Sequence, residues 1–292
     1  MTQPYPEPPY PSRKQPMPGS TREMDPRPDH GEESYKGSGK LTGKKAVITG
    51  GNSGIGLGVA EGLAQAGASV VIWGTNVEKN LAAEARLLAH GVRVLAQKVD
   101  VSDEHAVVGA MAEAIVAMGR LDFVVANAGV GGGAAFTEMT ADIWRRVMSV
   151  NLDGVAWTLR EACKHMLERA KAGDPGGSLA VTSSVSAIHG APRNEAYASS
   201  KGAVIAMVKG LAVEFARHGV RANAIVPGWI RSDMTAGLQA WDTFNEKVIS
   251  RVPVGRWGEP EDFAGIAVYL ASDASRFHTG DTFVIDGGYT VF

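Results

Sequence analysis

The stretch that decides the fold is TGGNSGIG at residues 49–56, directly after the apolar run Lys45 to Thr49. A segment with the apolar period of a helix, Ile55 to Ala66, begins at its end. Glycines in such a turn let the backbone approach a phosphate and let the helix pack on the strand. The helix N-terminus adds free N–H groups and a partial positive charge. The turn therefore predicts a site for the pyrophosphate of a dinucleotide.

Outward from this turn, short β-like runs alternate with longer helical runs, which is typical of a parallel sheet covered by helices. The predicted strands are Lys45 to Thr49, Ser69 to Trp73, Arg93 to Val99, Leu121 to Ala126, Ser178 to Thr182, Arg221 to Val226 and Thr282 to Ile285. The predicted helices are Ile55 to Ala66, Val77 to His90, Asp103 to Met118, Ala141 to Ala170, Ala196 to His218 and Pro260 to Ala271. Four of them are followed by glycines typical of C-terminal caps, namely Gly67, Gly91, Gly119 and Gly219.

These elements predict one α/β domain over residues 41–292. We expect a Rossmann-type, doubly wound sheet of seven mainly parallel strands, with the site at their carboxyl ends. Residues 1–40 differ, because nine of the 14 prolines fall in the first 28 residues. That composition cannot sustain a helix or a ladder, so this stretch is predicted to be an extended arm. The arm is either a disordered tail or docks on the body or on a neighbouring subunit through Tyr5, Pro6, Pro9, Tyr10 and Met17.

Charge and composition exclude several classes of function. A formal net charge of -2 and a pI near 6.4 leave no basic excess for nucleic acid. The single cysteine, Cys163, cannot form an internal disulfide and is expected to be a buried apolar residue, and no Cys/His cluster has metal-ligand spacing. No secretory signal and no apolar run of about 18 residues is evident. We therefore expect a cytoplasmic protein that binds no metal, membrane or nucleic acid.

The residues that carry chemistry gather around Tyr197. Tyr197 and Lys201 are four residues apart on a predicted helix, so both side chains project from one face. A lysine cation there would stabilise the phenolate, and Tyr197 could act as general acid in reduction and general base in oxidation. Ser184, at the end of the fifth predicted strand, can donate to a substrate oxygen and stabilise developing charge. Ser183 and Ser186 lie close enough to compete for that role.

Taken together, these motifs resemble the classical short-chain dehydrogenase/reductase family over roughly residues 41–292. The TGxxxGxG turn, Asn151, Ser184 thirteen residues before Tyr197, and Lys201 four residues after it all match the family pattern. Asn127-Ala128-Gly129 and Pro227-Gly228 follow the fourth and sixth predicted strands, as they do in the family. The resemblance implies hydride transfer between a nicotinamide and a carbonyl or secondary alcohol. It selects Ser184 among the serines and gives Asn151 the role of holding a water that relays protons from Lys201.

Cofactor preference depends on the end of the second predicted strand, Gly74-Thr75-Asn76. Relatives that prefer NAD tend to carry Asp at the Gly74 position, and many that prefer NADP carry Arg at the Thr75 position. With no carboxylate to repel a 2′-phosphate, NADP(H) is favoured over NAD(H). Asp100 and Val101 match the pair that flanks the adenine, although Asp100 could instead cap the helix beginning near Asp103. Ser232 matches a hydroxyl that bonds the nicotinamide carboxamide in relatives.

The residues predicted to be catalytic are Ser184, Tyr197, Lys201 and Asn151. The residues predicted to bind the cofactor are Gly50, Asn52, Ser53, Gly54, Ile55, Gly56, Gly74, Thr75, Asn76, Asp100, Val101, Asn127, Ala128, Gly129, Tyr197, Lys201, Pro227, Gly228, Ile230 and Ser232.

The segment from Trp229 to Arg251 breaks the strand-helix rhythm and forms a mobile lid over the substrate in relatives. The core resembles sugar or polyol dehydrogenases and 3-oxoacyl thioester reductases, while the Pro-rich arm resembles an extension found in a group of bacterial relatives. His189 and the polar run Arg193-Asn194-Glu195 could recognise a hydroxylated or anionic substrate. Similar proteins are usually tetramers or dimers. The alternative function is a catalytically idle dinucleotide-binding redox sensor or scaffold, which the fold alone would permit.

Overall fold

The computed structural model describes Ser20 and residues 39–292. Nearly all of the predicted N-terminal arm, with the five side chains suggested for docking, lies outside the described residues.

Seven strands form one sheet in the order β3-β2-β1-β4-β5-β6-β7, and every pairing between neighbours is parallel. The strands are β1 (Lys45–Thr49), β2 (Ser69–Gly74), β3 (Val94–Lys98), β4 (Phe123–Ala126), β5 (Gly177–Thr182), β6 (Val220–Pro227) and β7 (Thr282–Ile285). The predicted single-domain, doubly wound α/β fold is thus confirmed. Strand order reverses between β1 and β4, and ligands of open α/β sheets bind at such a switch point.

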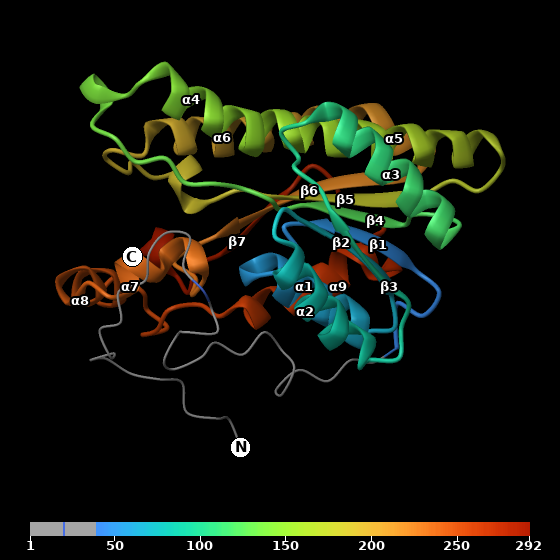
Figure 1. Cartoon of the computed structure of the whole chain (residues 1–292), viewed down its shortest axis with the longest axis horizontal. Coiled ribbons are helices and arrows are strands. Elements are labelled where there is room, and N and C mark those ends of the chain that lie inside the picture. Colours follow the sequence, from blue (N-terminus) through green and yellow to red (C-terminus); the bar gives the residue numbers. More distant parts are fainter. Residues whose placement is uncertain (1–19, 21–38) are drawn as a thin grey trace.

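Helices cover both faces of the sheet (Figure 1). One face carries α3 (Glu104–Met118), α5 (Gly154–Lys171) and α6 (Glu195–Phe215), and the other carries α1 (Gly54–Gln65), α2 (Val77–Leu88) and α9 (Ala264–Ala271). The predicted helix from Ala141 to Ala170 is interrupted. It consists of α4 (Ala141–Met148), a π-helical turn over Ser149–Asp153 and then α5. Such π-turns inside helices are frequent at functional sites.

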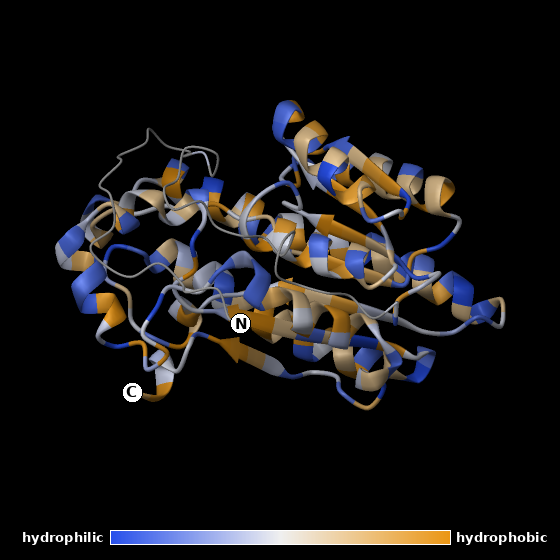
Figure 2. Ribbon diagram, turned by 90° about the horizontal axis from the view of Figure 1, so that it is seen from below, coloured by the Kyte–Doolittle hydropathy of each residue, from blue (hydrophilic) through white to orange (hydrophobic). Residues whose placement is uncertain are grey.

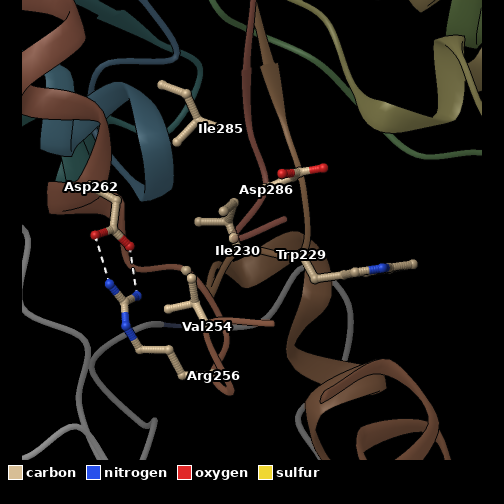
Figure 3. A pocket seen from close by; sticks show the side chains of 9 residues that line it. Trp229, Ile230, Val254, Arg256, Asp262, Ile285 and Asp286 are labelled. Atoms are coloured by element: carbon tan, nitrogen blue, oxygen red, sulfur yellow. Dashed lines mark hydrogen bonds and ion pairs between the residues drawn. The ribbon is translucent and has the colours of Figure 1, made fainter. Parts of the chain in front are cut away.

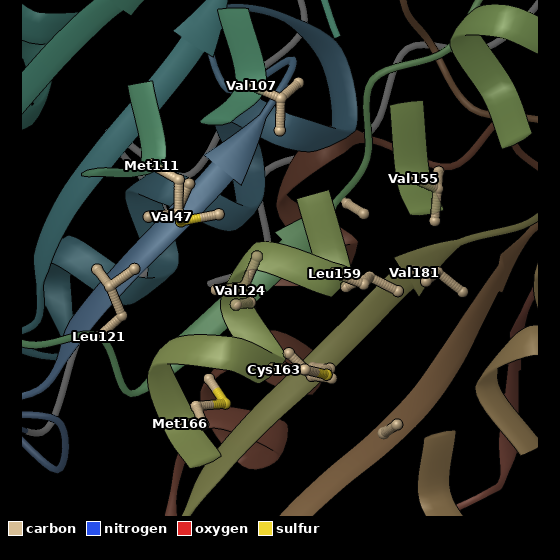
Figure 4. Close-up of a cluster of buried hydrophobic side chains, with 14 of the residues drawn as sticks. Val47, Val107, Met111, Leu121, Val124, Val155, Leu159, Cys163, Met166 and Val181 are labelled. Carbon is tan, nitrogen blue, oxygen red and sulfur yellow. The ribbon is translucent and has the colours of Figure 1, made fainter. Parts of the chain in front are cut away.

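Each face of the sheet contributes to its own apolar core, because successive strand side chains point to opposite faces. Val47 and Val124 lie in the core beneath α3, α5 and α6, whereas Ile48 and Val125 lie in the core beneath α1 and α9. Figure 4 shows the first of these cores, with Cys163 packed inside it as predicted. In Figure 2 the strands are largely hydrophobic while the helices alternate, which is the pattern of a sheet buried on both sides.

The four glycines predicted to end helices all have the left-handed backbone that favours glycine, with φ between 73° at Gly91 and 96° at Gly67. The predicted lid contains two short helices, α7 (Ala236–Gln239) and α8 (Asp242–Ile249). Its start is held by an ion pair of 3.0 Å between Arg231 Nε and Glu259 Oε1, both nearly buried. Trp241, which lies between α7 and α8, is 57% exposed.

Candidate active site

The glycine turn between β1 and α1 is too closely packed for side chains at several of its glycines. Gly50 and Gly54 have φ of 64° and 50°, which are strained for any residue with a side chain. A Cβ on Gly56 would lie 2.1 Å from the carbonyl oxygen of Gly50. Ser53 is the N-cap of α1, but its side chain makes no cap hydrogen bond. The Ser53 side chain therefore does not cap the first N–H groups of α1, and the binding of a pyrophosphate by these groups stays a prediction.

The ends of β1, β4 and β5 are tied together around Asn127. The hydroxyl of Thr49 accepts from the backbone N–H groups of Asn127 and Ala128, at 2.9 Å each. The amide of Asn127 donates to the Thr49 carbonyl at 3.0 Å and accepts from the Thr182 hydroxyl at 3.0 Å. Asn127 thus fixes the switch point of the sheet. The predicted site did not include Thr49, although its place as the first residue of the turn is the signal that could have identified it.

Lys201 is buried in the middle of the site, with 3% of its surface exposed. Its ammonium donates to the carbonyl oxygen of Thr182 at 2.6 Å and lies 5.6 Å from the centre of the Tyr197 ring. Burial lowers the pKa of Lys201 to about 8. The hydroxyl of Ser183 donates to the Lys201 carbonyl at 2.8 Å, which attaches α6 to the end of β5.

The side chains of Tyr197 and Ser184 lie near each other beside Lys201. Burial raises the pKa of Tyr197, and the nearby Ser184 hydroxyl opposes that rise. The Ser184 oxygen also accepts from the backbone N–H of Ser186 at 3.1 Å. Because Ser183 is committed to the Lys201 carbonyl, the arrangement favours Ser184 over Ser183 as the hydroxyl next to Tyr197.

Asn151 lies in the π-helical turn and is fully buried. Its side chain accepts from the backbone N–H of Val130 at 2.8 Å and donates to the Val130 carbonyl at 3.0 Å and to Ser200 at 3.2 Å. A Cβ on Gly129 would lie 3.3 Å from Asn151 Oδ1 and 3.4 Å from Lys201 Nζ. Asn151 therefore holds the segment after β4 against α6, and its predicted water relay stays a prediction.

The low pKa of Lys201 gives a testable dependence of stability on pH. Between about pH 8 and 10.5 the lysine is neutral in the native state and charged in the unfolded state, so the unfolded state binds more protons. The native state therefore gains stability as pH rises through this window. We expect the free energy of unfolding to rise by about 3 kcal/mol relative to Lys201→Met, measured by denaturant unfolding at several pH values. A difference between the two proteins that does not change with pH would contradict a buried, neutralised Lys201.

A network of amides occupies the end of β2, where the ribose substituent is predicted to be selected. Asn80 Nδ2 donates to the carbonyls of Gly74 and Gln97 at 3.0 Å each, so its Oδ1 must accept, and it accepts from Asn52 Nδ2 at 2.7 Å. A Cβ on Gly74 would lie 2.1 Å from Asn52 Nδ2. Any side chain at position 74, including the Asp of NAD-preferring relatives, would displace Asn52.

The remaining residues predicted to bind the cofactor border the same edge. Thr75 and Asn76 are exposed, and Asn76 caps α2 by accepting from the N–H of Lys79 at 2.9 Å. The helix α3 is capped by Asp103, and Asp100 instead accepts from Ser102, so the capping alternative for Asp100 is wrong.

The start of the lid lies directly over the glycine turn. A Cβ on Gly54 would lie 3.2 Å from Cβ of Ser232, and a Cβ on Gly228 would lie 2.7 Å from Cα of Asp286. A pocket of about 230 Å³ opens at the base of the lid. It is lined by Trp229, Ile230, Val254, Arg256, Gly258, Asp262, Ile285, Asp286 and Gly287 (Figure 3). None of the four residues predicted to be catalytic lines it.

Within residues 39–292 no group of three or more His, Cys, Asp or Glu side chains could hold a metal ion. None of the helices over the same residues is long and apolar enough to cross a membrane.

Comparison with known proteins gives consistent matches over the whole described domain. A family model described as enoyl-(acyl carrier protein) reductase matches residues 50–290. A gluconate 5-dehydrogenase of Gluconobacter oxydans (strain 621H) is 36% identical over 251 residues, covering 86% of this chain and 96% of that protein. A 3-oxoacyl-[acyl-carrier-protein] reductase of Chlamydia pneumoniae is 36% identical over 250 residues, covering 86% and 98%. The crystal structure of a gluconate 5-dehydrogenase from Burkholderia cenocepacia J2315 in complex with NADP and tartrate has a TM-score of 0.82 at 35% identity, covering 87% of this chain and 98% of that one.

Proposed function

Because the chain belongs to the classical short-chain dehydrogenase/reductase family, we propose that it interconverts a ketone and a secondary alcohol of a sugar-acid-like substrate, with NADP(H) as cofactor. It is an NAD(P)-dependent oxidoreductase that acts on CH–OH and C=O groups, as its relatives do. The observation that carries the proposal is the buried Lys201 ammonium beside the Tyr197–Ser184 pair.

The nicotinamide, when bound, supplies or accepts the hydride. In reduction Tyr197 donates its phenolic proton to the carbonyl oxygen, and in oxidation it takes the proton of the hydroxyl. Ser184 donates a hydrogen bond to the same substrate oxygen and stabilises the negative charge that grows on it. Lys201, when charged, lowers the pKa of Tyr197 against the effect of burial. Asn151 holds the turn after β4 beside Lys201.

The preference for NADP(H) is supported by the end of β2. No carboxylate stands at Gly74, and the Asn52 and Asn80 side chains fill the space where one would lie. The amide of Asn52 and the hydroxyl of Thr75 are neutral groups that do not repel a 2′-phosphate. Three further groups would hold the rest of the cofactor: the open N-terminus of α1 at the pyrophosphate, Asp100 and Val101 at the adenine, and Ile230 and Ser232 at the nicotinamide.

The substrate class is supported by polar groups near the predicted mouth of the site. The ring of His189 lies 6.1 Å from that of Tyr289, and the Arg251 guanidinium lies 4.7 Å from the same Tyr289 ring. Imidazole and guanidinium groups suit hydroxyl and carboxylate oxygens. A 3-oxoacyl thioester is the second candidate, favoured by the exposed Met234 and Trp241 of the lid, which offer an apolar wall.

We also propose that the protein is cytoplasmic and assembles with itself into a dimer or tetramer. We propose α6 as a contact surface in this assembly, and its Val213 is 84% exposed. Multi-angle light scattering of the full chain would give the mass of the assembly.

Titration of the full chain with NADPH and with NADH tests the proposal, with the fluorescence of the nicotinamide as readout. We expect NADPH to bind at least about tenfold more tightly, a difference of about 1.4 kcal/mol. Each complex is then given keto sugars, keto sugar acids and oxoacyl thioesters, and oxidation of the cofactor is followed. Oxidation with a keto sugar acid is the expected result. Binding of neither cofactor would refute the proposed function, and binding without turnover on the whole panel would favour the redox sensor.

A further inference from the structure

An ion pair joins α2 to the start of the lid, although its two residues are 154 positions apart. Lys79 Nζ lies 2.6 Å from Asp233 Oδ2, with side chains that are 31% and 11% exposed. Lys79 is in the first turn of α2, and Asp233 begins the short 3-10 helix Asp233–Thr235. No role in proton transfer requires either residue, so their pairing needs another explanation.

Both residues stand beside the predicted cofactor site. The backbone N–H of Lys79 donates to the side chain of Asn76, so Lys79 lies within one helical turn of the second residue after β2. That strand end is where the ribose substituent is read. On the other side, Ser232 packs against Gly54 of the pyrophosphate turn and is the neighbour of Asp233. The ion pair therefore connects the segment after β2, at the predicted ribose site, to the start of the lid, beside the predicted pyrophosphate turn.

Lys79 and the polar residues next to it are suited to binding an anion. A lysine ammonium in the first turn of a helix, next to a Thr and an Asn, is a set of groups that binds phosphate. In this structure the carboxylate of Asp233 pairs with the Lys79 ammonium. The exposed and neutral Thr75 occupies the position of the Arg found in many NADP-preferring relatives, which leaves Lys79 as the cation nearest in sequence to the end of β2.

We propose that Lys79 selects NADP(H) by binding the 2′-phosphate, and that Asp233 is the counter-ion which the phosphate replaces. The inference rests on the proposed function, because it presumes that a nicotinamide dinucleotide binds between the glycine turn and the end of β2. A carboxylate at the Gly74 position would favour NAD. The proposal assigns the preference for NADP(H) to Lys79, five positions further along the chain. It also couples cofactor binding to the lid, since the start of the lid loses its link to α2 when the phosphate takes Lys79.

Binding of NADP⁺ and NAD⁺, measured by calorimetry on the full chain without substrate, tests the assignment. Lys79→Gln is expected to weaken NADP⁺ binding about tenfold and to change NAD⁺ binding less than twofold. Lys79→Arg, which keeps the charge, is expected to preserve the preference. Asp233→Asn removes the competing carboxylate and is expected to strengthen NADP⁺ binding while leaving NAD⁺ binding unchanged. Adenosine 2′,5′-bisphosphate and 5′-AMP serve as smaller probes and should follow NADP⁺ and NAD⁺ respectively.

Lys98→Gln is the matched control, because Lys98 is an exposed lysine at the end of β3 and is paired in register with Gly74. It should not alter the ratio of the two affinities. An equal loss for both cofactors in Lys79→Gln would mean that the bridge only holds the lid, and no change in either would remove Lys79 from the site. Both results overturn the inference while leaving the proposed function intact. Failure of the unaltered chain to bind either dinucleotide would instead refute the proposed function itself.

Discussion

Replacing Tyr197 with Phe is expected to lower kcat by about 10³-fold, close to 4 kcal/mol in the barrier, because the substrate oxygen loses the phenol that we propose exchanges a proton with it. Ser184 also loses the phenolic hydroxyl beside it, so its own hydroxyl is expected to be held less firmly toward the substrate oxygen. The dissociation constant of NADPH is expected to change less than twofold, since the ring and Lys201 remain. Steady-state kinetics and fluorescence titration on the same preparation measure both quantities.

Tyr269→Phe is the matched control for this experiment. It also removes a phenolic hydroxyl from a partly buried tyrosine, one whose hydrogen-bond partner is His278, a residue outside the predicted site. Its kcat should equal that of the unaltered enzyme. A Tyr197→Phe protein with more than a tenth of the normal kcat would show that another group moves the proton. Loss of turnover with cofactor binding retained would separate an enzyme from an idle dinucleotide sensor.

Replacing Gly56 with Ala is expected to weaken binding of NADPH and NADH alike, by at least about 100-fold or 2.7 kcal/mol. The added Cβ would lie 2.1 Å from the Gly50 carbonyl oxygen and 2.5 Å from Asn127 Nδ2. Gly50 belongs to the backbone of the turn and cannot rotate away, so the turn must open and its N–H groups move. Overpacking of this kind also costs about 1–3 kcal/mol of stability, which denaturant unfolding would measure beside the fluorescence titration.

Gly109→Ala in α3 provides the contrast, because a Cβ there has no atom within 4 Å. This variant should bind both cofactors normally and unfold at a slightly higher denaturant concentration, since alanine favours a helix over glycine. Normal affinity for both cofactors in a folded Gly56→Ala protein would place the pyrophosphate elsewhere. The loss should be equal for the two cofactors, unlike the selective loss expected for Lys79→Gln.

Local sequence determined the fold of this protein. Seven apolar runs, the first six of which are each followed by a turn and a helical segment, can bury both faces only as one parallel sheet between two layers of helices. The glycine turn, Asn127, Ser184, Tyr197 and Lys201 could be placed at the carboxyl ends of the strands because each directly follows a strand or begins the next helix. Those positions depend on separations of a few residues, which the chain itself fixes.

Tertiary structure alone decided which of these groups meet, because contacts between distant segments depend on packing. It committed Ser183 to the Lys201 carbonyl and left Ser184 to Tyr197. It broke the long predicted helix with a π-turn so that Asn151 reaches Val130. It also brought Asp233 to Lys79 across 154 residues. The sequence shows that Lys79 carries a positive charge, but only the packing of the lid beside α2 shows that Asp233 pairs with it.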